Sequence, residues 1–288
     1  MSSAITLAFC IALQVSGTEE PVKPKAKAPA KPMPTKQIQF KQVGDVKLHL
    51  HVFEPKGHKA EARRPAIVFF FGGGWVGGSP GQFYPQCQHL ADQGVIAISA
   101  EYRVKSRNKT TPFECVKDGK SAMRYVRSHA SKLGIDPNRI AAGGGSAGGH
   151  VAAATGTVPG VNEEGEDTSV SCVPCAMVLF NPVYDNGPGG YGYQKLKDRY
   201  KEISPLHNIS KKTPPTIVFL GTKDKLIPVA TGEKFRDKMK SLRIPSELIL
   251  FKDRGHGFFN QNKGDGNDYR KTLREMDRFL RQVRFIRD

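Results

Sequence analysis

The sequence predicts an α/β fold with a doubly wound, mostly parallel sheet flanked by helices, and three observations carry this prediction. Short unbroken apolar runs recur along the chain, as in strands that are buried on both faces. Segments with the helical spacing of apolar residues lie between these runs. An alternating polar and apolar stretch, residues 37–53, precedes them and indicates an N-terminal β-hairpin that turns at Gly44-Asp45 and has one solvated face.

The expected elements follow one another in alternation. The strands are residues 66–71, 95–99, 140–142, 176–180, 217–220 and 248–251, and the helices start near Phe83 and cover residues 115–130, 146–155, 234–242 and 268–285. Ser79, followed by Pro80, is the expected N-cap of the first helix. Right-handed crossovers between such elements give a doubly wound sandwich. With 288 residues and 38% hydrophobic content, the chain can bury one sizeable core.

The N-terminal segment differs in composition from the rest. Residues 1–17 carry no charged side chain and contain an apolar run at 4–15, which is too short to span a bilayer. This predicts a signal peptide and a secreted or periplasmic protein; a frayed apolar terminus is the alternative. Residues 18–36 are rich in Pro, Lys and Ala and predict a flexible basic linker. The folded domain is therefore expected at 37–288.

The formal net charge is +17, and most of it falls on the predicted domain. Such a charge favours contact with an anionic polymer such as an acidic polysaccharide, although a solvated basic surface is preferred over any specific partner. No basic cluster with interleaved aromatic residues is present, so no nucleic-acid partner is expected.

Cysteine and histidine pairs raise the question of disulfides and metal sites. His49 and His51 stand two apart on the hairpin, but no third ligand is visible, and a solvated strand face is expected. A C-x-x-C pair lacks a second pair or a nearby His, so no metal site is expected either. If Cys10 leaves with the signal peptide, four cysteines remain that could form two disulfides in any of three pairings: Cys87, Cys115, Cys172 and Cys175.

A candidate nucleophile lies at the end of an expected strand. Residues 144–148, Gly-Gly-Ser-Ala-Gly, match G-x-S-x-G and pass from strand to helix. This turn is so tight that side chains at the flanking positions would collide, which explains the glycines. Residues 77–81 match the same motif, but Ser79 follows its strand at a distance and Pro80 has no N–H for an oxyanion. Ser146 is therefore the candidate nucleophile.

A nucleophilic serine needs a base, and the base needs a group that orients it. His256 comes directly after an expected strand and lies between two glycines, whereas His207 follows no strand and suits a surface or cap position. Asp224 also follows a strand, while Asp253 is too near His256 in the chain to reach its ring. The expected triad is Ser146, Asp224 and His256.

The tetrahedral intermediate of acyl transfer needs an anion site. Gly73 and Gly74 follow the strand that ends at residue 71, in a position to face the start of the helix at Ser146. Their amides and that of Ala147 form the expected oxyanion hole. Trp75 is expected to wall the substrate pocket, with core packing as the alternative.

These motifs together resemble the hormone-sensitive-lipase-like branch of the α/β-hydrolases, close to small carbohydrate esterases such as acetyl xylan esterases. The resemblance covers residue 37 to the C-terminus and rests on residues 72–75, 101–103, 145–150, 204–206, 221–224 and 255–257. The family usually has His before its glycine triplet, and Phe71 stands there in this chain. The hydrogen bond by which that His braces the loop must therefore be replaced.

The resemblance also bears on the cleft. Larger lipases of the family carry a helical cap, whereas this domain opens with a hairpin, so little or no cap and an open cleft are expected. The segment 184–215 could form a small lid, in which Tyr191 and Tyr193 could stack on sugar rings.

The expected function is therefore a serine carboxylic-ester hydrolase that removes short acyl groups, acetyl above all, from an alcohol such as a carbohydrate, without metal or cofactor. Three alternatives remain. An amide or formamide hydrolase would use the same triad. A catalytically weak secreted protein could bind polyanions. Dinucleotide binding is suggested by G-x-G-x-x-G at residues 72–77 and 143–148, but leaves the triad unexplained.

Overall fold

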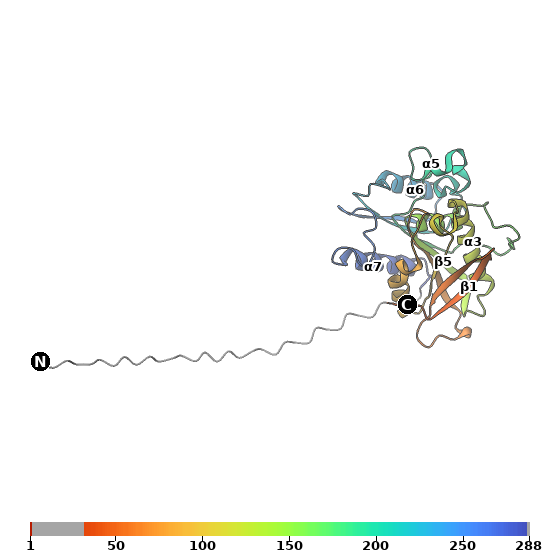
Figure 1. Ribbon diagram of the computed structural model, residues 1–288, viewed down its shortest axis with the longest axis horizontal. Coiled ribbons are helices and arrows are strands. Elements are labelled where there is room, and N and C mark those ends of the chain that lie inside the picture. The colour runs from red at the N-terminus through yellow and green to blue at the C-terminus, as the bar shows by residue number, and fades with distance from the viewer. Residues whose placement is uncertain (2–31, 287–288) are drawn as a thin grey trace. The chain divides into compact units, whose positions relative to one another are not determined.

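The computed structural model describes Met1 and residues 32–286. Its eight strands form one sheet in the order β1-β2-β4-β3-β5-β6-β7-β8 (Figure 1). The strands are β1 (Lys36–Val43), β2 (Val46–Phe53), β3 (Arg64–Phe70), β4 (Ile96–Ala100), β5 (Ile135–Gly145), β6 (Met177–Phe180), β7 (Thr216–Gly221) and β8 (Ser246–Phe251). The pairs from β4 through β3 to β8 are parallel, and β2 pairs antiparallel with both β1 and β4. The predicted α/β sheet with an N-terminal hairpin is confirmed.

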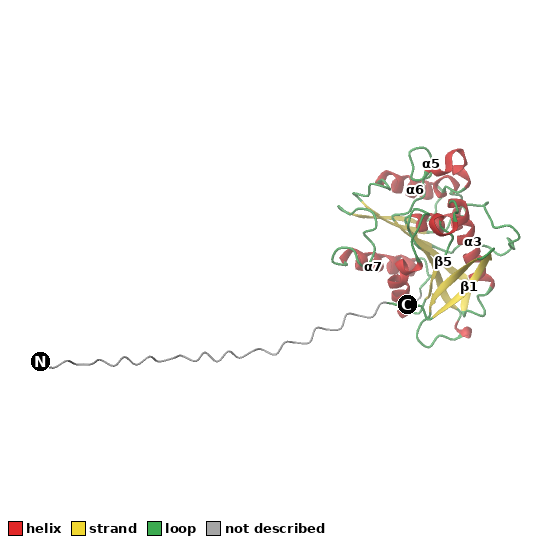
Figure 2. Cartoon of the chain, viewed as in Figure 1, coloured by secondary structure: helices red, strands yellow, loops and turns green. Residues whose placement is uncertain are grey.

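Helices cover both faces of this sheet (Figure 2). They are α1 (Tyr84–Asp92), α2 (Lys105–Asn108), α3 (Pro112–Ser128), α4 (Ala147–Thr157), α5 (Tyr193–Leu196), α6 (Val229–Ser241) and α7 (Asn267–Gln282), with short 3-10 helices η1 (Ala60–Ala62), η2 (Pro80–Phe83), η3 (Lys197–Glu202) and η4 (Pro205–Asn208). Among the described residues, none of the helices combines the length and apolar character needed to cross a membrane.

Two hydrophobic cores lie on opposite faces of the sheet. In β3, Val68 and Phe70 belong to the core under α3, α4 and α6, whereas Ile67 and Phe69 belong to the core under α1 and α7. Successive side chains of a strand point to opposite faces, so one continuous apolar run supplies both cores. The unbroken apolar runs in the sequence are explained by this arrangement.

The longest helix shows how the local sequence sets an element boundary. Thr111 precedes α3 and accepts a hydrogen bond from the Phe113 amide, while the Glu114 carboxylate accepts one from the Thr111 amide at 2.8 Å. Pro112 takes the first helical position, where no amide donor is needed. This capping box fixes the start of the helix that packs beside α4.

The expected cap at the first helix is wrong in its detail. Ser79 lies at the start of η2, and its side chain makes no capping hydrogen bond. The chain passes through this 3-10 turn before α1 begins at Tyr84, so the amides that Ser79 was expected to cap are not those of an α-helix.

The expected solvated hairpin face is also wrong for His51, whereas the His49 side chain stays 33% exposed. Both rings contact the Glu101 carboxylate, at 3.0 and 3.4 Å, and His51 is buried against the Tyr84 hydroxyl. The reason is topological, since β2 is an inner strand between β1 and β4 and α1 covers this face. At the other end of the hairpin, the Thr35 amide already donates to Val52 O, so sheet pairing starts just before β1.

The remaining expectations on the N-terminus and on the cysteines have different outcomes. The expected signal peptide, after Met1, and the expected linker up to residue 31 lie outside the described residues. All four described cysteines are free thiols, so the two possible disulfides are not formed: Cys87, Cys115, Cys172 and Cys175.

A buried ion cluster fastens the hairpin to the rest of the domain. Asp118 of α3 is fully buried, contacts Lys41 of β1 at 2.7 Å and accepts two hydrogen bonds from the Arg103 guanidinium at 2.8 Å. Glu163 contacts Lys41 at 2.7 Å and Arg103 at 2.5 Å. Burial alone would raise the pKa of Glu163, but these two cations outweigh it and lower the pKa to about 2.

We expect this cluster to make the fold acid-sensitive. Because the pKa of Glu163 is about 2 in the folded protein and near 4.5 otherwise, its stabilising contribution is present above about pH 4.5 and is lost toward pH 2. Thermal melting should show a lower Tm for Glu163→Gln than for wild type at neutral pH. The difference should shrink as the pH falls through this range.

The neighbouring Glu164 is exposed and gives a matched control, since Glu164→Gln should leave the melting temperature nearly unchanged. A Tm difference between Glu163→Gln and wild type that stays constant down to pH 3 would contradict the ionic origin.

Candidate active site

The candidate nucleophile stands in a strained turn between β5 and α4. Ser146 has φ 54° and ψ −120°, a backbone conformation that residues other than glycine rarely adopt. A β-carbon on Gly144 would overlap the Gly148 carbonyl, and one on Gly148 would overlap the carbonyl oxygens of Phe70 and Phe71. The glycines of the motif are therefore required by close backbone contacts, as the sequence predicts.

The structure brings Ser146, His256 and Asp224 together from three segments. His256 Nε2 lies 2.9 Å from Ser146 Oγ, and His256 Nδ1 lies 2.7 Å from Asp224 Oδ2. Asp224 follows β7 and His256 follows β8, so the parallel order of the strands places both at the same edge of the sheet as Ser146. The hydrogen-bonded chain has the geometry of a nucleophile, a base and an orienting acid. His207 and Asp253, the poorer candidates, contact Ser204 and Lys223 instead.

Asp224 is held as a carboxylate. Burial alone would raise its pKa, but the hydrogen bonds from His256 and from the amides of Ile227 and Leu226 outweigh burial and leave the pKa lowered. Those two amides donate to Oδ1 at 3.0 and 2.8 Å. An ionised Asp224 fixes His256 with its proton on Nδ1 and leaves Nε2 free to accept the Ser146 proton.

Three backbone amides are available beside Ser146. No hydrogen bond joins the amides of Gly73, Gly74 or Ala147 to another residue within 32–286. Residues 72–74, which follow β3, form the glycine loop. This loop lies directly against the nucleophile, because a β-carbon on Gly72 would stand 3.3 Å from Ser146 Cβ. The amides expected to form the oxyanion hole are therefore unpaired donors in two segments that meet at the serine.

Other side chains brace the glycine loop in place of the family histidine. Phe71 is fully buried and stacks on Tyr102, with ring centroids 4.2 Å apart, and the Tyr102 hydroxyl donates to Phe71 O at 2.5 Å. The Gly72 amide donates to Gln82 Oε1 at 2.6 Å. These two hydrogen bonds hold the loop backbone at the place where the family histidine is replaced by Phe71.

Gln82 also joins the glycine loop to the loop that carries His256. Its Nε2 donates to Asn260 Oδ1 at 3.0 Å, and Asn260 Nδ2 donates to Gly257 O at 2.8 Å. The Gly257 amide in turn donates to Asn181 Oδ1 at 2.9 Å. Asn181 Nδ2 lies 3.4 Å from His256 Nε2. This series of hydrogen bonds therefore connects the glycine loop to His256 of the triad.

Three of these residues are not among those predicted from the sequence: Gln82, Asn181 and Asn260. Asn181 directly follows β6, so its position at the end of a strand is a signal that could have found it. Gln82 and Asn260 lie in a 3-10 turn and a loop, where no sequence pattern marks them.

Trp75 is buried in the core rather than exposed in a cleft. It is 1% exposed, and its indole N–H donates to His150 Nδ1 at 3.3 Å. His150 Nε2 contacts Ile203 O at 2.9 Å, and burial lowers the pKa of His150 to about 4, so the ring is neutral. The core-packing alternative describes the position of Trp75.

The segment 184–215 between β6 and β7 is an insert over the sheet edge, and two of its tyrosines, Tyr191 and Tyr193, differ in position. Tyr191 is half-buried over Trp75, with ring centroids 5.6 Å apart, and its hydroxyl oxygen lies 3.1 Å from where a β-carbon on Gly74 would stand. Tyr193 begins α5 and packs edge-on against Tyr200. Of the two, Tyr191 alone reaches the glycine loop.

Within the described part of the chain, no group of three or more His, Cys, Asp or Glu side chains is arranged to hold a metal ion.

We expect Gln82 to act as a positioning residue. Gln82→Leu removes both hydrogen bonds that join the two loops, and a misplaced oxyanion loop should lower kcat by roughly 10- to 100-fold with little change in KM. Steady-state kinetics on a small aryl ester measures the effect, and Gln82→Glu, which keeps the acceptor for Gly72, should recover part of the loss.

Gln88→Leu on the exposed side of α1 is the matched control and should retain wild-type kinetics. Equal kcat values for Gln82→Leu and wild type would show that the bridge does not position the loop.

Comparisons with known proteins agree with this geometry. Residues 50–174 match the model of the BD-FAE family, and residues 187–287 match that of the dienelactone hydrolase family. Thermogutta terrifontis esterase 2, solved after phosphorylation by paraoxon, is 43% identical with a TM-score of 0.85, over 90% of this chain and 98% of that one. The propionate-bound form of the same esterase is 42% identical with a TM-score of 0.84, over 90% of this chain and 98% of that one.

A curated relative, esterase LipC of Mycobacterium tuberculosis, is 30% identical over 76% of this chain and 58% of its own length. The probable carboxylic ester hydrolase LipM of the same organism is 30% identical over 67% of this chain and 49% of its own length. The chain thus spans about half the length of these curated relatives. The resemblance predicted from the sequence is confirmed: the chain belongs to the α/β-hydrolase family of esterases.

Proposed function

We propose that the protein is a serine carboxylic-ester hydrolase that releases short acyl groups, acetyl above all, from a carbohydrate alcohol. The observation that carries the proposal is the hydrogen-bonded chain from Ser146 Oγ through His256 to Asp224, at 2.9 and 2.7 Å. The unpaired amides of Gly73, Gly74 and Ala147 beside it support the same reaction.

Each step of the proposed reaction follows from this geometry. Ser146 Oγ attacks the acyl carbonyl carbon while its proton passes to His256 Nε2, and the three amides donate to the oxyanion. The bond to the alcohol oxygen then breaks as His256 returns the proton to that oxygen, which leaves the acyl group on Ser146. A water molecule attacks this ester and gives its proton to His256. Collapse of the second intermediate frees the acid, and Ser146 Oγ regains the proton.

Two features support a short acyl group and an accessible cleft. Thermogutta terrifontis esterase 2 has been solved bound to propionate and to butyrate, both short acids. The segment between β6 and β7, which holds α5, η3 and η4, is the main structure added over this edge of the sheet, and no larger cap is present in residues 32–286. The carbohydrate part of the proposal rests on the family resemblance.

Covalent labelling tests the proposed nucleophile without knowledge of the substrate. A related esterase was solved phosphorylated by paraoxon, so we expect paraoxon to add one diethylphosphoryl group to this protein. Intact-mass spectrometry should detect the adduct, peptide mapping should assign it to Ser146, and Ser146→Ala should remain unlabelled. Labelling of Ser146→Ala to the same extent as wild type would remove the assignment.

Hydrolysis of p-nitrophenyl acetate tests the roles of the triad. Asp224→Asn should lower kcat by about four orders of magnitude, because the neutral amide no longer holds His256 in the correct tautomer. Ser79→Ala, which alters the other copy of the motif, should retain full activity. Equal background rates for wild type and Ser146→Ala would instead favour a binding protein on a hydrolase scaffold.

The pH dependence of kcat/KM reports the same base. The lowered pKa of Asp224 keeps it ionised throughout the mildly acidic range, and a base must be unprotonated to accept the Ser146 proton. We expect kcat/KM for p-nitrophenyl acetate to rise from mildly acidic to neutral pH. A rate that is unchanged over this range contradicts the assignment of His256 as the base.

A further inference from the structure

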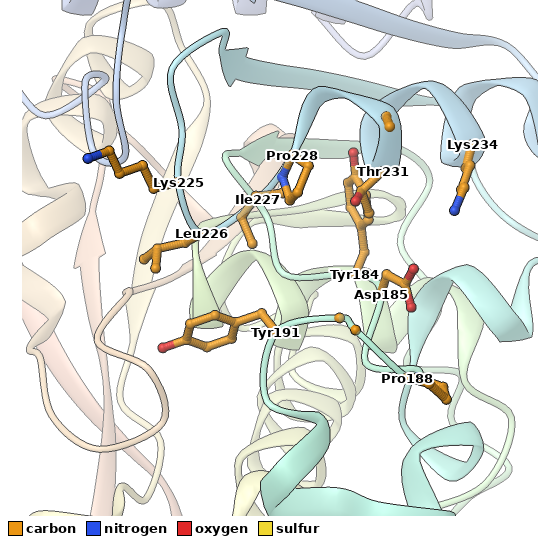
Figure 3. A pocket seen from close by; sticks show the side chains of 13 residues that line it. Tyr184, Asp185, Pro188, Tyr191, Lys225, Leu226, Ile227, Pro228, Thr231 and Lys234 are labelled. Atoms are coloured by element: carbon orange, nitrogen blue, oxygen red, sulfur yellow. The ribbon is translucent and has the colours of Figure 1, made fainter.

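A polar pocket of about 350 Å³ lies beside the triad, between the insert and the loop that leads into α6 (Figure 3). Leu226 and Ile227 line one wall, and their amides are the two donors to Asp224 Oδ1. Tyr191 lines the facing wall, and its hydroxyl reaches toward Gly74 of the glycine loop. One wall of the pocket therefore adjoins Asp224 of the triad, and the other adjoins Gly74 of the glycine loop.

Two of the charged side chains, Asp185 and Lys234, lie away from this junction, whereas Lys225 lies on the same side as Leu226. In Figure 3, Tyr191 and Leu226 lie on one side of the pocket, and Asp185, Thr231 and Lys234 lie on the other. A substrate whose ester group reaches Ser146 past Tyr191 would thus place its distant part among these three side chains.

Several polar groups in the pocket have no partner among the described residues. No hydrogen bond or ion pair within residues 32–286 involves the Thr231 hydroxyl or the Lys234 ammonium. Asp185 Oδ1 accepts from the Gly187 amide at 2.9 Å, which leaves Oδ2 available. Asp185 and Thr231 are half-buried and Lys234 is exposed, so a polar occupant of the pocket can contact all three side chains.

The mixture of groups narrows the chemistry of that occupant. Asp185 repels an anion and Lys234 repels a cation, while an apolar group would leave the Thr231 hydroxyl without a hydrogen-bond partner. A hydroxyl both donates and accepts, so neighbouring hydroxyls on one ring can satisfy Asp185 and Lys234 together. The volume is within the range of small-molecule sites.

We infer that this pocket binds the sugar ring of the leaving alcohol, with Asp185 accepting from, and Lys234 and Thr231 donating to, neutral hydroxyl groups of one ring. The Tyr191 ring lies between this subsite and Gly74 of the glycine loop. This inference rests on the proposed esterase function and adds the site that recognises the alcohol.

Two acetates with the same ester linkage test the inference. Methyl 6-O-acetylglucoside and cyclohexylmethyl acetate both carry the ester on a methylene group attached to a six-membered ring, but only the first has ring hydroxyls. Wild type should favour the sugar acetate in kcat/KM. Each of Lys234→Met and Thr231→Val should lower the ratio of the two kcat/KM values by roughly tenfold, the effect of one lost hydrogen bond.

Lys240→Met, on the exposed face of the same helix α6, is the control and should keep both the ratio and the rate on p-nitrophenyl acetate. Wild-type ratios in Lys234→Met and Thr231→Val would overturn the subsite and leave the esterase proposal intact. If Ser146→Ala hydrolyses p-nitrophenyl acetate as fast as wild type, the esterase proposal fails instead.

In that case calorimetry decides the subsite separately. Methyl glucoside should bind wild type and bind Lys234→Met at least tenfold more weakly. Absence of binding to wild type, or equal binding to both proteins, would overturn it.

Discussion

The close contact between the start of α4 and the end of β3 is the constraint on which the rest of the site depends. Gly148 lies so near the carbonyl oxygens of Phe70 and Phe71 that no larger residue fits there. This contact holds the Ala147 amide beside the glycine loop that follows β3, and it forces Ser146 into a conformation with φ 54°. Strain in the turn is offset by burial of the whole of α4 in the core. The nucleophile is thus presented at the sheet edge by packing, before any substrate is bound.

A second level of organisation comes from polar side chains that connect loops from different strands. Tyr102, after β4, fixes the carbonyl of Phe71, and Gln82 links the amide of Gly72 to the loop after β8 through Asn260. The glycine loop keeps its place although its family histidine is replaced, because hydrogen bonds to its backbone can come from any side chain that reaches it. Loop order here is a property of the network and is not tied to one residue type.

The insert between β6 and β7 contributes differently, since it shapes the surroundings of the triad rather than the triad. The buried pair Trp75 and His150 anchors it to the start of α4, and Tyr191 rests on that pair. A neutral His150 suits this role, because a charged ring could not be buried there without a counter-charge. The rigid base allows the insert to present Asp185 beside α6 and to form the polar pocket with it.

The sequence alone determined the sheet, the hairpin and the three residues of the candidate triad. Apolar runs reveal strands that are buried on both faces, and catalytic side chains follow strand ends because parallel strands finish at one edge of the sheet. Local patterns of this kind are written in consecutive residues. Ser146, Asp224 and His256 all occupy such positions.

Only the tertiary structure decided which distant side chains meet. The bridge from Gln82 to Asn260 joins residues 178 positions apart, and the exposure of His49 and His51 depended on β2 being an inner strand. Trp75 became a core residue because His150 and Tyr191 enclose it from two other segments. Neither contact nor burial across such separations has a local signature, since both arise from the packing of segments whose sequences do not depend on one another.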